Sequence, residues 1–209
     1  MLLDRRRVKF WQKIIFTLMA FLMVIFALGT SVYYIGCNGS NGRAVTPNDT
    51  VKTAAAKVRK HPQSPAARLA LAQAWLQLAN AQTQGSSAES SALDNAASAY
   101  QKYIKLQSGS GLEAKRNRLD AAMALVSIYN RTQDYSKLVA AYGLLTELQP
   151  DNADNYISYG LAATNAGRTD LAILAYQKYL ELAPKGLYAK DVKARLKKLQ
   201  KQVSASPSP

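Results

Sequence analysis

The chain of 209 residues offers few side chains that could perform chemistry. Its single histidine, His61, stands between Lys60 and Pro62, and no residue beside it could make it a general base. Its single cysteine, Cys37, lacks a neighbouring base, and one Cys with one His cannot supply a protein-only zinc or thiolate site. The sequence also lacks a phosphate-binding loop, a Gly-x-Ser-x-Gly motif, a His-Glu-x-x-His motif and an Asp-rich calcium loop. We therefore expect no enzymatic activity, no cofactor and no metal.

Three carboxylates occupy positions that could suggest a catalytic group. Asp151 and Asp154 follow Pro150 at an expected helix start, where carboxylates cap the helix and stabilise the positive end of its dipole. Asp170 is expected to do the same for the next helix. These carboxylates predict helix starts rather than acid–base chemistry.

A long apolar segment near the start of the chain predicts a membrane anchor. Residues 14–36 contain no ionisable group except two tyrosines. As a helix they would extend about 34 Å, against about 30 Å for the hydrocarbon core of a bilayer. Residues 1–13 carry five positive charges and one negative charge, which places the N-terminus in the cytoplasm. We expect a cytoplasmic basic tail, a single-pass transmembrane helix and an extracytoplasmic domain on the periplasmic or cell-surface side.

Two alternatives to an uncleaved anchor stay open. Ala27-Leu28-Gly29 fits the small-residue pattern of a signal-peptide cleavage site, although the apolar character continues to Ile35. Cys37 follows Gly36, which resembles the end of a bacterial lipobox, but Tyr34 is bulkier than the usual residue there. In each case the rest of the chain leaves the cytoplasm.

The composition changes after this segment. Residues 37–50 are expected to be a flexible linker, because they are rich in Gly, Asn and Ser and lack periodicity. Residues 51–203 are rich in Ala, Leu, Gln, Lys and Tyr and poor in β-branched residues, which predicts an all-α domain. Residues 204–209 are expected to form a disordered tail.

Internal repetition is the strongest signal in the chain. The similar segments that begin at Tyr142 and Tyr176 are 34 residues apart, as are Pro150 and Pro184. A related segment begins at Tyr100, two periods plus eight residues before Tyr176. A period of 34 residues closed by a helix-ending proline is typical of helix–turn–helix repeats.

The third copy shows what such a pair of helices needs. Gly160 and Ala172 are small where two helices must cross closely, and Gly167 permits the turn between them. With these residues the third copy resembles the tetratricopeptide repeat (TPR) family. The resemblance implies an α-solenoid of about three TPR-like helix pairs with N- and C-terminal capping helices. The matching residues are Tyr156, Tyr159, Gly160, Gly167, Ala172, Tyr176, Tyr179 and Pro184.

The other copies depart from the pattern. In the second copy, Val126 replaces the small residue and Gln133 replaces the turn glycine. In the first copy, which starts near Pro65, an insertion at residues 81–92 is expected to form a surface loop, and residues 107–111 replace the closing proline. A lone helix at residues 51–60 and a final helix at residues 188–203 are expected to cap the array. The apolar stripe of the final helix consists of Val192, Leu196, Leu199 and Val203.

The resemblance implies a partner groove lined by the first helix of each pair, through its second, fifth, ninth and twelfth positions. Chaperone-binding members place Lys in this groove, but Leu69, Met123 and Ile157 occupy the Lys position here. We expect the groove to bind a hydrophobic or amphipathic segment; the alternative is that some of these side chains pack between repeats. The candidates are Leu69, Gln73, Leu76, Asp120, Met123, Ser127, Asn130, Asp154, Ile157, Leu161 and Thr164.

The formal net charge of +14 is partly concentrated near the C-terminus, where residues 185–201 hold seven basic residues and one acid. This segment is interpreted either as a solvated capping helix or as a contact for anionic headgroups or wall polymers. Nucleic acid is not expected as a partner, because no recognition motif is present. The candidates for anionic-surface contact are Lys190, Lys193, Arg195, Lys197 and Lys198.

The predicted function is a membrane-anchored scaffold that docks a partner protein or extended peptide in its concave groove. The alternatives are a permanent structural subunit of a membrane complex, and wall or anionic-lipid binding through the final helix. The layout of anchor, linker and repeats resembles the TPR modules of cytochrome c maturation proteins and anchored actinobacterial TPR proteins. The first resemblance implies that an unfolded or extended client is held for assembly.

Overall fold

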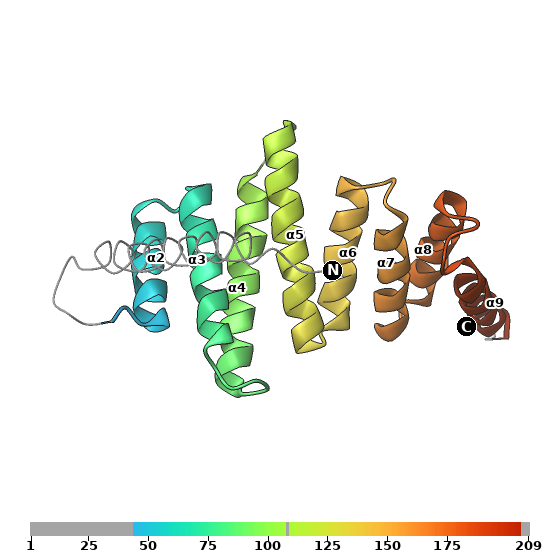
Figure 1. Cartoon of the computed structure of the whole chain (residues 1–209), viewed down its shortest axis with the longest axis horizontal. Helices are drawn as coiled ribbons and strands as arrows, with labels where there is room; N and C mark the ends of the chain where they lie inside the picture. Colours follow the sequence, from blue (N-terminus) through green and yellow to red (C-terminus); the bar gives the residue numbers. More distant parts are fainter. Residues whose placement is uncertain (1–43, 108, 206–209) are drawn as a thin grey trace, which may run out of the picture. The chain divides into compact units, whose positions relative to one another are not determined.

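The computed structural model describes residues 44–107 and 109–205, and this part of the chain is entirely helical (Figure 1). Eight helices and no strand occur in it, which confirms the all-α prediction. The expected tail at residues 1–13 and the transmembrane helix at residues 14–36 lie outside the described residues. Within the described ranges no helix is long and apolar enough to cross a membrane. The helices are α2 (Pro47–Lys60), α3 (Pro65–Asn80), α4 (Ser87–Leu106), α5 (Leu112–Thr132), α6 (Tyr135–Leu148), α7 (Ala153–Asn165), α8 (Thr169–Leu182) and α9 (Ala189–Ala205).

The helices of the unit that begins at Thr46 lie side by side in chain order, from α2 to α9 (Figure 1). Each helix packs mainly on the one before it and the one after it. Three helix pairs, α3–α4, α5–α6 and α7–α8, stand between α2 and α9. This arrangement is the stack of helix pairs that a TPR-like solenoid requires.

Short polar side chains start five of these helices. Each accepts a hydrogen bond from a backbone N–H of the first turn and so satisfies one of the amides that the helix leaves free. At α2 the cap is reciprocal, because Thr46 and Asp49 each accept from the other's backbone N–H. The five capping residues are Thr46, Ser64, Ser86, Asp134 and Asn152.

Alanines and tyrosines make up much of the core. The small alanines allow neighbouring helices to approach closely, and the tyrosine rings fill the remaining space. The alanines with no exposed surface are Ala72, Ala79, Ala96, Ala122, Ala163 and Ala172. The buried tyrosines are Tyr100, Tyr103, Tyr129, Tyr176 and Tyr179.

The crossing of α7 and α8 confirms the predicted role of the small residues. A Cβ atom on Gly160 would lie 2.6 Å from Cδ1 of Tyr176, so any side chain there would displace the ring. Ala172, on the opposing helix, is fully buried. Gly160 and Tyr176 therefore set how closely this helix pair can pack.

The turns within the pairs also follow the pattern. Gly167 has φ +72°, in the left-handed region that glycine adopts without a steric penalty. Gln133, which stands at the equivalent turn of the second pair, has φ +55° and ends α5 in the same left-handed region. The turn geometry is thus retained even where the glycine is missing.

The insertion in the first pair differs from the prediction. Only residues 81–86 form the connection, because α4 begins at Ser87 and already buries Glu89 and Ala92. The prediction of a loop through residue 92 was wrong. A run of small polar residues can form a loop. Here, however, the Ser86 hydroxyl accepts a hydrogen bond from the N–H of Glu89 and caps a helix that includes these residues.

Glu89 holds this connection against the next helix pair. Its carboxylate accepts a hydrogen bond from the backbone N–H of Gly85 and forms an ion pair with Arg131 of α5. Arg131 also donates to Oδ1 of Asn80 at 2.7 Å. Glu89 is 3% exposed, so its charge is compensated by Arg131 rather than by water. One buried carboxylate therefore joins the first pair to the second.

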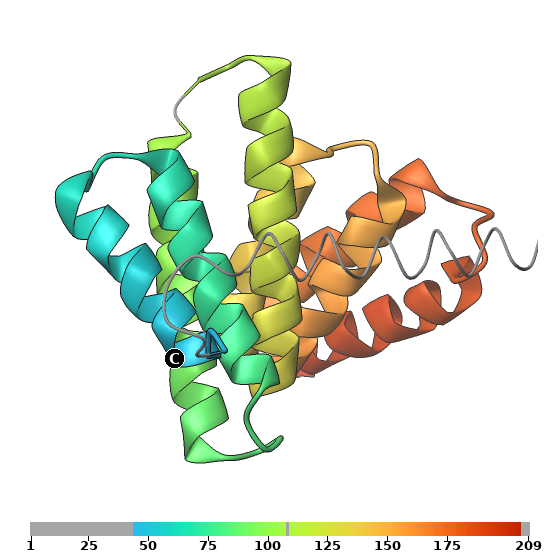
Figure 2. The same cartoon turned by 60° about the vertical axis from the view of Figure 1, so that its left-hand side comes forward.

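Three other boundaries differ from the prediction. α2 begins at Pro47, so the end of the expected linker at residues 37–50 is helical. α5 begins at Leu112, seven residues before Leu119, the predicted start of the second repeat, and projects beyond its neighbours (Figure 2). α9 continues to Ala205, into the expected disordered tail. The apolar stripe of α9 is confirmed for Val192 and Leu199, which are buried, and for Leu196, which packs against the core. It was wrong for Val203, which is exposed because it lies in the last turn of the helix.

We expect Gly160→Ala to destabilise the domain. Overpacking against Tyr176 costs about 1–3 kcal/mol, more than the roughly 1 kcal/mol that Ala gains over Gly in a helix. The matched control is Gly143→Ala in α6, where the nearest atom, the Tyr159 hydroxyl, lies 3.9 Å from the added Cβ. This control should raise the free energy of unfolding by about 0.5–1 kcal/mol. Urea unfolding followed by circular dichroism measures both, and equal effects of the two variants would contradict the proposed crossing.

A second stability prediction concerns Glu89. Glu89→Ala removes a buried partner of Arg131 and should lower the free energy of unfolding by about 2–3 kcal/mol. Glu181→Ala, which breaks a surface ion pair with Lys178 at 2.7 Å, should cost at most about 1 kcal/mol. The comparison uses the same unfolding assay, and a Glu89→Ala effect as small as that of Glu181→Ala would show that the buried pair does not connect the repeats.

Candidate functional site

The predicted groove residues lie on α3, α5 and α7, the first helices of the three pairs. Those on α5 form the clearest exposed row. They follow one another at intervals of three or four residues and therefore share one face of the helix. All four are exposed: Asp120, Met123, Ser127 and Asn130. The opposite face of α5 is buried, through Ala121, Leu125 and Ile128.

The row on α7 is divided between exposed and packed residues. Asp154 and Leu161 are exposed, but Ile157 packs against the core. Thr164 is also partly buried, and its hydroxyl donates to the carbonyl of Gly160 at 2.7 Å. The same hydroxyl lies 3.4 Å from the Tyr176 hydroxyl. Ile157 and Thr164 therefore contribute to the packing of the pair, as the alternative interpretation of the groove expected.

The row on α3 is mostly packed. Gln73 is exposed, whereas Leu69 and Leu76 are partly buried against the core. The exposed apolar groups among the groove residues are therefore Met123, which is 56% exposed, and Leu161, which is 45% exposed. They lie on the first helices of two successive pairs.

The groove residues carry negative charge only. Asp120 and Asp154 form no ion pair within the described part of the chain. Burial raises the pKa of the Tyr103 hydroxyl on α4, and the charge of Asp120 raises that pKa further. None of the groove residues is Lys or Arg. The exposed groove residues of α5 and α7 thus include both apolar side chains and carboxylates.

The aspartates do mark helix starts, because Asp154 and Asp170 lie in the first turns of α7 and α8, but none of the three is an N-cap residue. Asn152, not Asp151 or Asp154, caps α7, and its side chain accepts from the N–H of Asp154 at 3.1 Å. At α8 the N-cap position is Arg168, which makes no side-chain cap bond. Asp170 instead forms an ion pair with Arg168 at 3.2 Å, which lowers the pKa of the aspartate.

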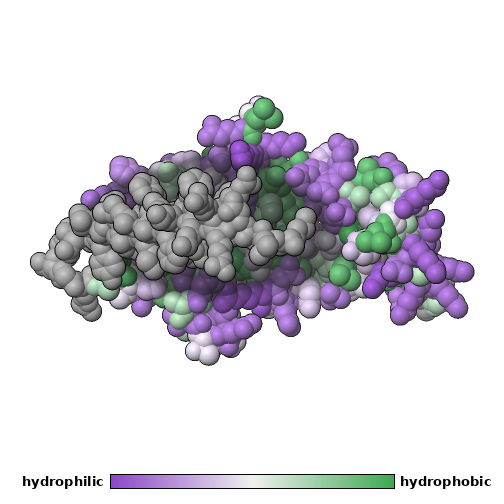
Figure 3. Space-filling view, viewed as in Figure 1, coloured by the Kyte–Doolittle hydropathy of each residue, from purple (hydrophilic) through white to green (hydrophobic). Residues whose placement is uncertain are grey.

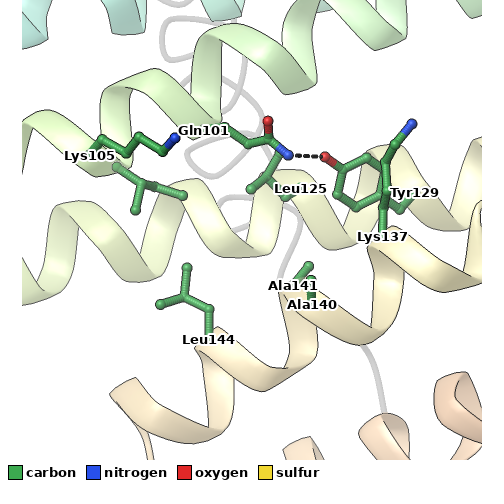
Figure 4. A pocket seen from close by; sticks show the side chains of 9 residues that line it. Gln101, Lys105, Leu125, Tyr129, Lys137, Ala140, Ala141 and Leu144 are labelled. Atoms are coloured by element: carbon green, nitrogen blue, oxygen red, sulfur yellow. Dashed lines mark hydrogen bonds between the residues drawn. The ribbon is translucent and has the colours of Figure 1, made fainter. Parts of the chain in front are cut away.

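A pocket that the sequence analysis missed lies between α4, α5 and α6. Its volume is about 380 Å³, and apolar side chains of all three helices form much of its lining (Figure 4). Gln101 Nε2 donates to the Tyr129 hydroxyl at 2.9 Å on one side. The lining comes from three helices that are separated in sequence, so no local pattern could indicate it. The lining residues are Gln101, Ile104, Lys105, Leu125, Tyr129, Lys137, Ala140, Ala141 and Leu144.

Lys137 fixes the polar edge of this pocket. Its ammonium group lies 5.8 Å from the centroid of the Tyr129 ring and 2.8 Å from Oδ2 of Asp134. The hydrogen bond to Asp134 raises the pKa of Lys137 and lowers the pKa of Asp134. Because Lys137 already forms an ion pair with Asp134, its positive charge is largely neutralised by that carboxylate.

The predicted anionic-surface residues are all exposed on α9: Lys190, Lys193, Arg195, Lys197 and Lys198. His61 is also exposed, and its backbone N–H ends α2 by donating to the carbonyl of Lys57. In the described ranges no cluster of three or more His, Cys, Asp or Glu side chains could hold a metal ion. The expectation that the protein is not an enzyme stays a prediction.

Comparison with known proteins gives likenesses of fold only. No protein-family model and no curated protein matches the chain. A solved double mutant of MamA RS-1 is 16% identical over 76% of this chain and 82% of that chain, with a TM-score of 0.44. A thermophilic TPR protein of Thermus thermophilus is 19% identical over 74% of this chain and 73% of that chain, with a TM-score of 0.37. The first TPR of Spaghetti (RPAP3), bound to an HSP90 peptide, is 19% identical over 64% of this chain and 94% of that chain, with a TM-score of 0.35.

Proposed function

We propose that this protein is a scaffold that binds an extended or amphipathic segment of a partner across α5 and α7. The observation that carries this proposal is the exposure of Met123 and Leu161 on the first helices of two successive pairs. Single exposed apolar residues are common on protein surfaces. Two of them at predicted groove positions, on the first helices of successive pairs, support a binding surface.

The charge of the groove residues narrows the chemistry of the partner. Asp120 and Asp154, each at the second position of its helix in the repeat, have no ion-pair partner in the described ranges. A segment that places an aliphatic or aromatic side chain against Met123 or Leu161 and a Lys or Arg near a carboxylate would satisfy both features. The lack of a basic groove residue argues against capture of a C-terminal carboxylate.

The proposed place of action is the extracytoplasmic face of a membrane. This part of the proposal rests on the apolar residues 14–36 and the basic residues 1–13. Nine residues separate position 36 from Thr46, so an anchor there would keep the start of the helical unit within about 35 Å of the bilayer. The scaffold would then meet partners that are themselves membrane-bound or newly exported.

Two ways of using the groove are compatible with this proposal. A client-holding module binds its partner reversibly, as the resemblance to cytochrome c maturation modules implies, and that resemblance stays a prediction. A permanent subunit of a membrane complex stays bound through gentle detergent extraction and high salt. Stoichiometric co-purification at about 0.1 M and about 1 M salt separates the two uses.

The groove is tested by Met123→Asp and Leu161→Asp in the full chain, expressed in its native cells. Each variant places a charge on an exposed site, so the fold should persist while the apolar contact is lost. The expected result is at least a tenfold weaker recovery of the partner, corresponding to about 1.4 kcal/mol or more. The matched control is Leu174→Asp on α8, where the leucine is 61% exposed.

The measurement is quantitative co-purification from solubilised membranes, with circular dichroism to confirm folding. Ile157 is not substituted, because it packs against the core and an aspartate there would destabilise the domain as well as the groove. Equal partner recovery with the Met123, Leu161 and Leu174 variants would contradict the groove assignment. Loss of recovery with Leu174→Asp alone would move the binding surface to α8.

A further inference from the structure

The excess of positive over negative charge in the helical unit is confined to its two ends. Residues 65–182, which hold the three helix pairs, contain ten basic and ten acidic side chains. Residues 183–205 contain seven basic side chains and one acidic side chain, and α2 contains four basic and one acidic. The C-terminal end is therefore the most strongly charged surface in the described part of the chain.

The lysines of α9 are arranged in a row. Lys190, Lys193, Lys197 and Lys201 recur at intervals of three and four residues and so share one side of the helix. They lie away from Val192 and Leu199, which are buried against the rest of the unit. All four lysines are exposed, and none forms an ion pair with a described residue.

The turn before α9 presents two exposed apolar side chains beside this row. Leu187 is 87% exposed and Tyr188 is 46% exposed. They stand between Lys185 and Lys190. At this end of the unit, over α8 and α9, hydrophilic side chains form the rim and hydrophobic groups lie next to them (Figure 3).

This turn is held in place by defined contacts. Gly186 donates to the carbonyl of Ala183 at 3.0 Å, and Tyr188 donates its N–H to the Tyr179 hydroxyl at 3.2 Å. A Cβ on Gly186 would lie 2.8 Å from the Tyr179 hydroxyl, so the turn fits closely over the buried tyrosine. Leu187 is therefore kept outward by a structured turn.

We propose that this end of the unit, residues 185–201, docks on an anionic phospholipid surface, with Leu187 entering the headgroup region. The row of lysines meets anionic headgroups, and the exposed leucine and tyrosine meet the apolar–polar boundary beneath them. This site goes beyond the groove, because it uses neither α5 nor α7. It depends on the proposed membrane location in one respect only, namely that a lipid surface must be within reach of the site.

The side chains favour lipid over other polyanions. The basic residues of α9 are five lysines and one arginine, so most of them act as point charges rather than as bidentate forks. Base stacking needs successive aromatic side chains along the basic row, and residues 185–201 offer Tyr188 alone, before α9 begins. A bilayer surface, in contrast, offers both negative charge and a place for an exposed leucine.

The mode of binding differs from that of an inserted amphipathic helix. Most of the apolar side of α9 is already covered, because Val192 and Leu199 are buried and Leu196 packs against the core, whereas Val203 near the end of the helix is 54% exposed. The helix therefore cannot turn that side toward the lipid without leaving the core. Attachment should depend on the lysines and on one apolar turn, and it should weaken as salt screens the charges.

The test is lysine footprinting of the full chain in nanodiscs. The chain is reconstituted in discs of phosphatidylcholine alone or with about 30% phosphatidylglycerol, and acetylation rates of individual lysines are measured by mass spectrometry. Lys190, Lys193 and Lys197 should react at least about threefold more slowly in the anionic discs, and the protection should disappear at about 0.5 M salt. Lys102 and Lys105, which are exposed on α4, are the internal controls and should not change.

Two leucine variants complete the experiment. Leu187→Ser should remove most of the protection, whereas Leu174→Ser, at an exposed leucine of α8, should leave it unchanged.

Equal rates in the two kinds of disc, or equal protection in discs without anionic lipid, would overturn the proposal. Protection that is insensitive to Leu187→Ser would overturn the role of the turn, and protection that requires an added acidic protein would assign the surface to a protein partner. Entry of the chain into neutral discs tests the anchor separately.

Discussion

The close crossing of two helices over a glycine is the constraint on which the rest of this structure depends. Gly160 leaves room for the Tyr176 ring, and the fully buried alanines of the other helices allow similarly close packing. Helices that approach this closely bury their apolar faces on both neighbours, so each inner helix keeps only a narrow exposed row. The proposed groove is made of such rows. Among the described helices, α2 and α9 each pack mainly on one neighbour, and the excess positive charge lies at these two ends.

Much of the fold could be predicted because its rules are local. Tyrosines and closing prolines recur 34 residues apart in the second and third copies, and in the third copy Gly160 and Gly167 supply the small residue at the crossing and the turn, each for its own physical reason. The start of α4 could not be predicted in this way. Whether the residues after Ser86 form a loop or a helix depends on Glu89, whose partner Arg131 is 42 residues away in the sequence. Such a long-range pair leaves no periodic signal.

The site was predicted less completely than the fold. Position within a repeat identified Met123 and Leu161 as exposed groove residues, but it could not separate them from Leu69 or Ile157, which have the same chemistry and are packed. The difference lies in how far the neighbouring helix covers each residue, which depends on crossing geometry and not on residue type. The pocket beside Tyr129 was missed for a related reason, since its lining belongs to three helices.

The packing of Gly160 against Tyr176 is measured most directly by a double-mutant cycle. The free energy of unfolding is determined for Gly160→Ala, for Tyr176→Leu and for the double variant. If the added methyl group is costly because it meets the tyrosine ring, Gly160→Ala should lose at least about 1 kcal/mol of its cost when the ring is absent. An unchanged cost in the Tyr176→Leu background would show that the two residues are not coupled, and the account of how the helix pairs pack would be wrong.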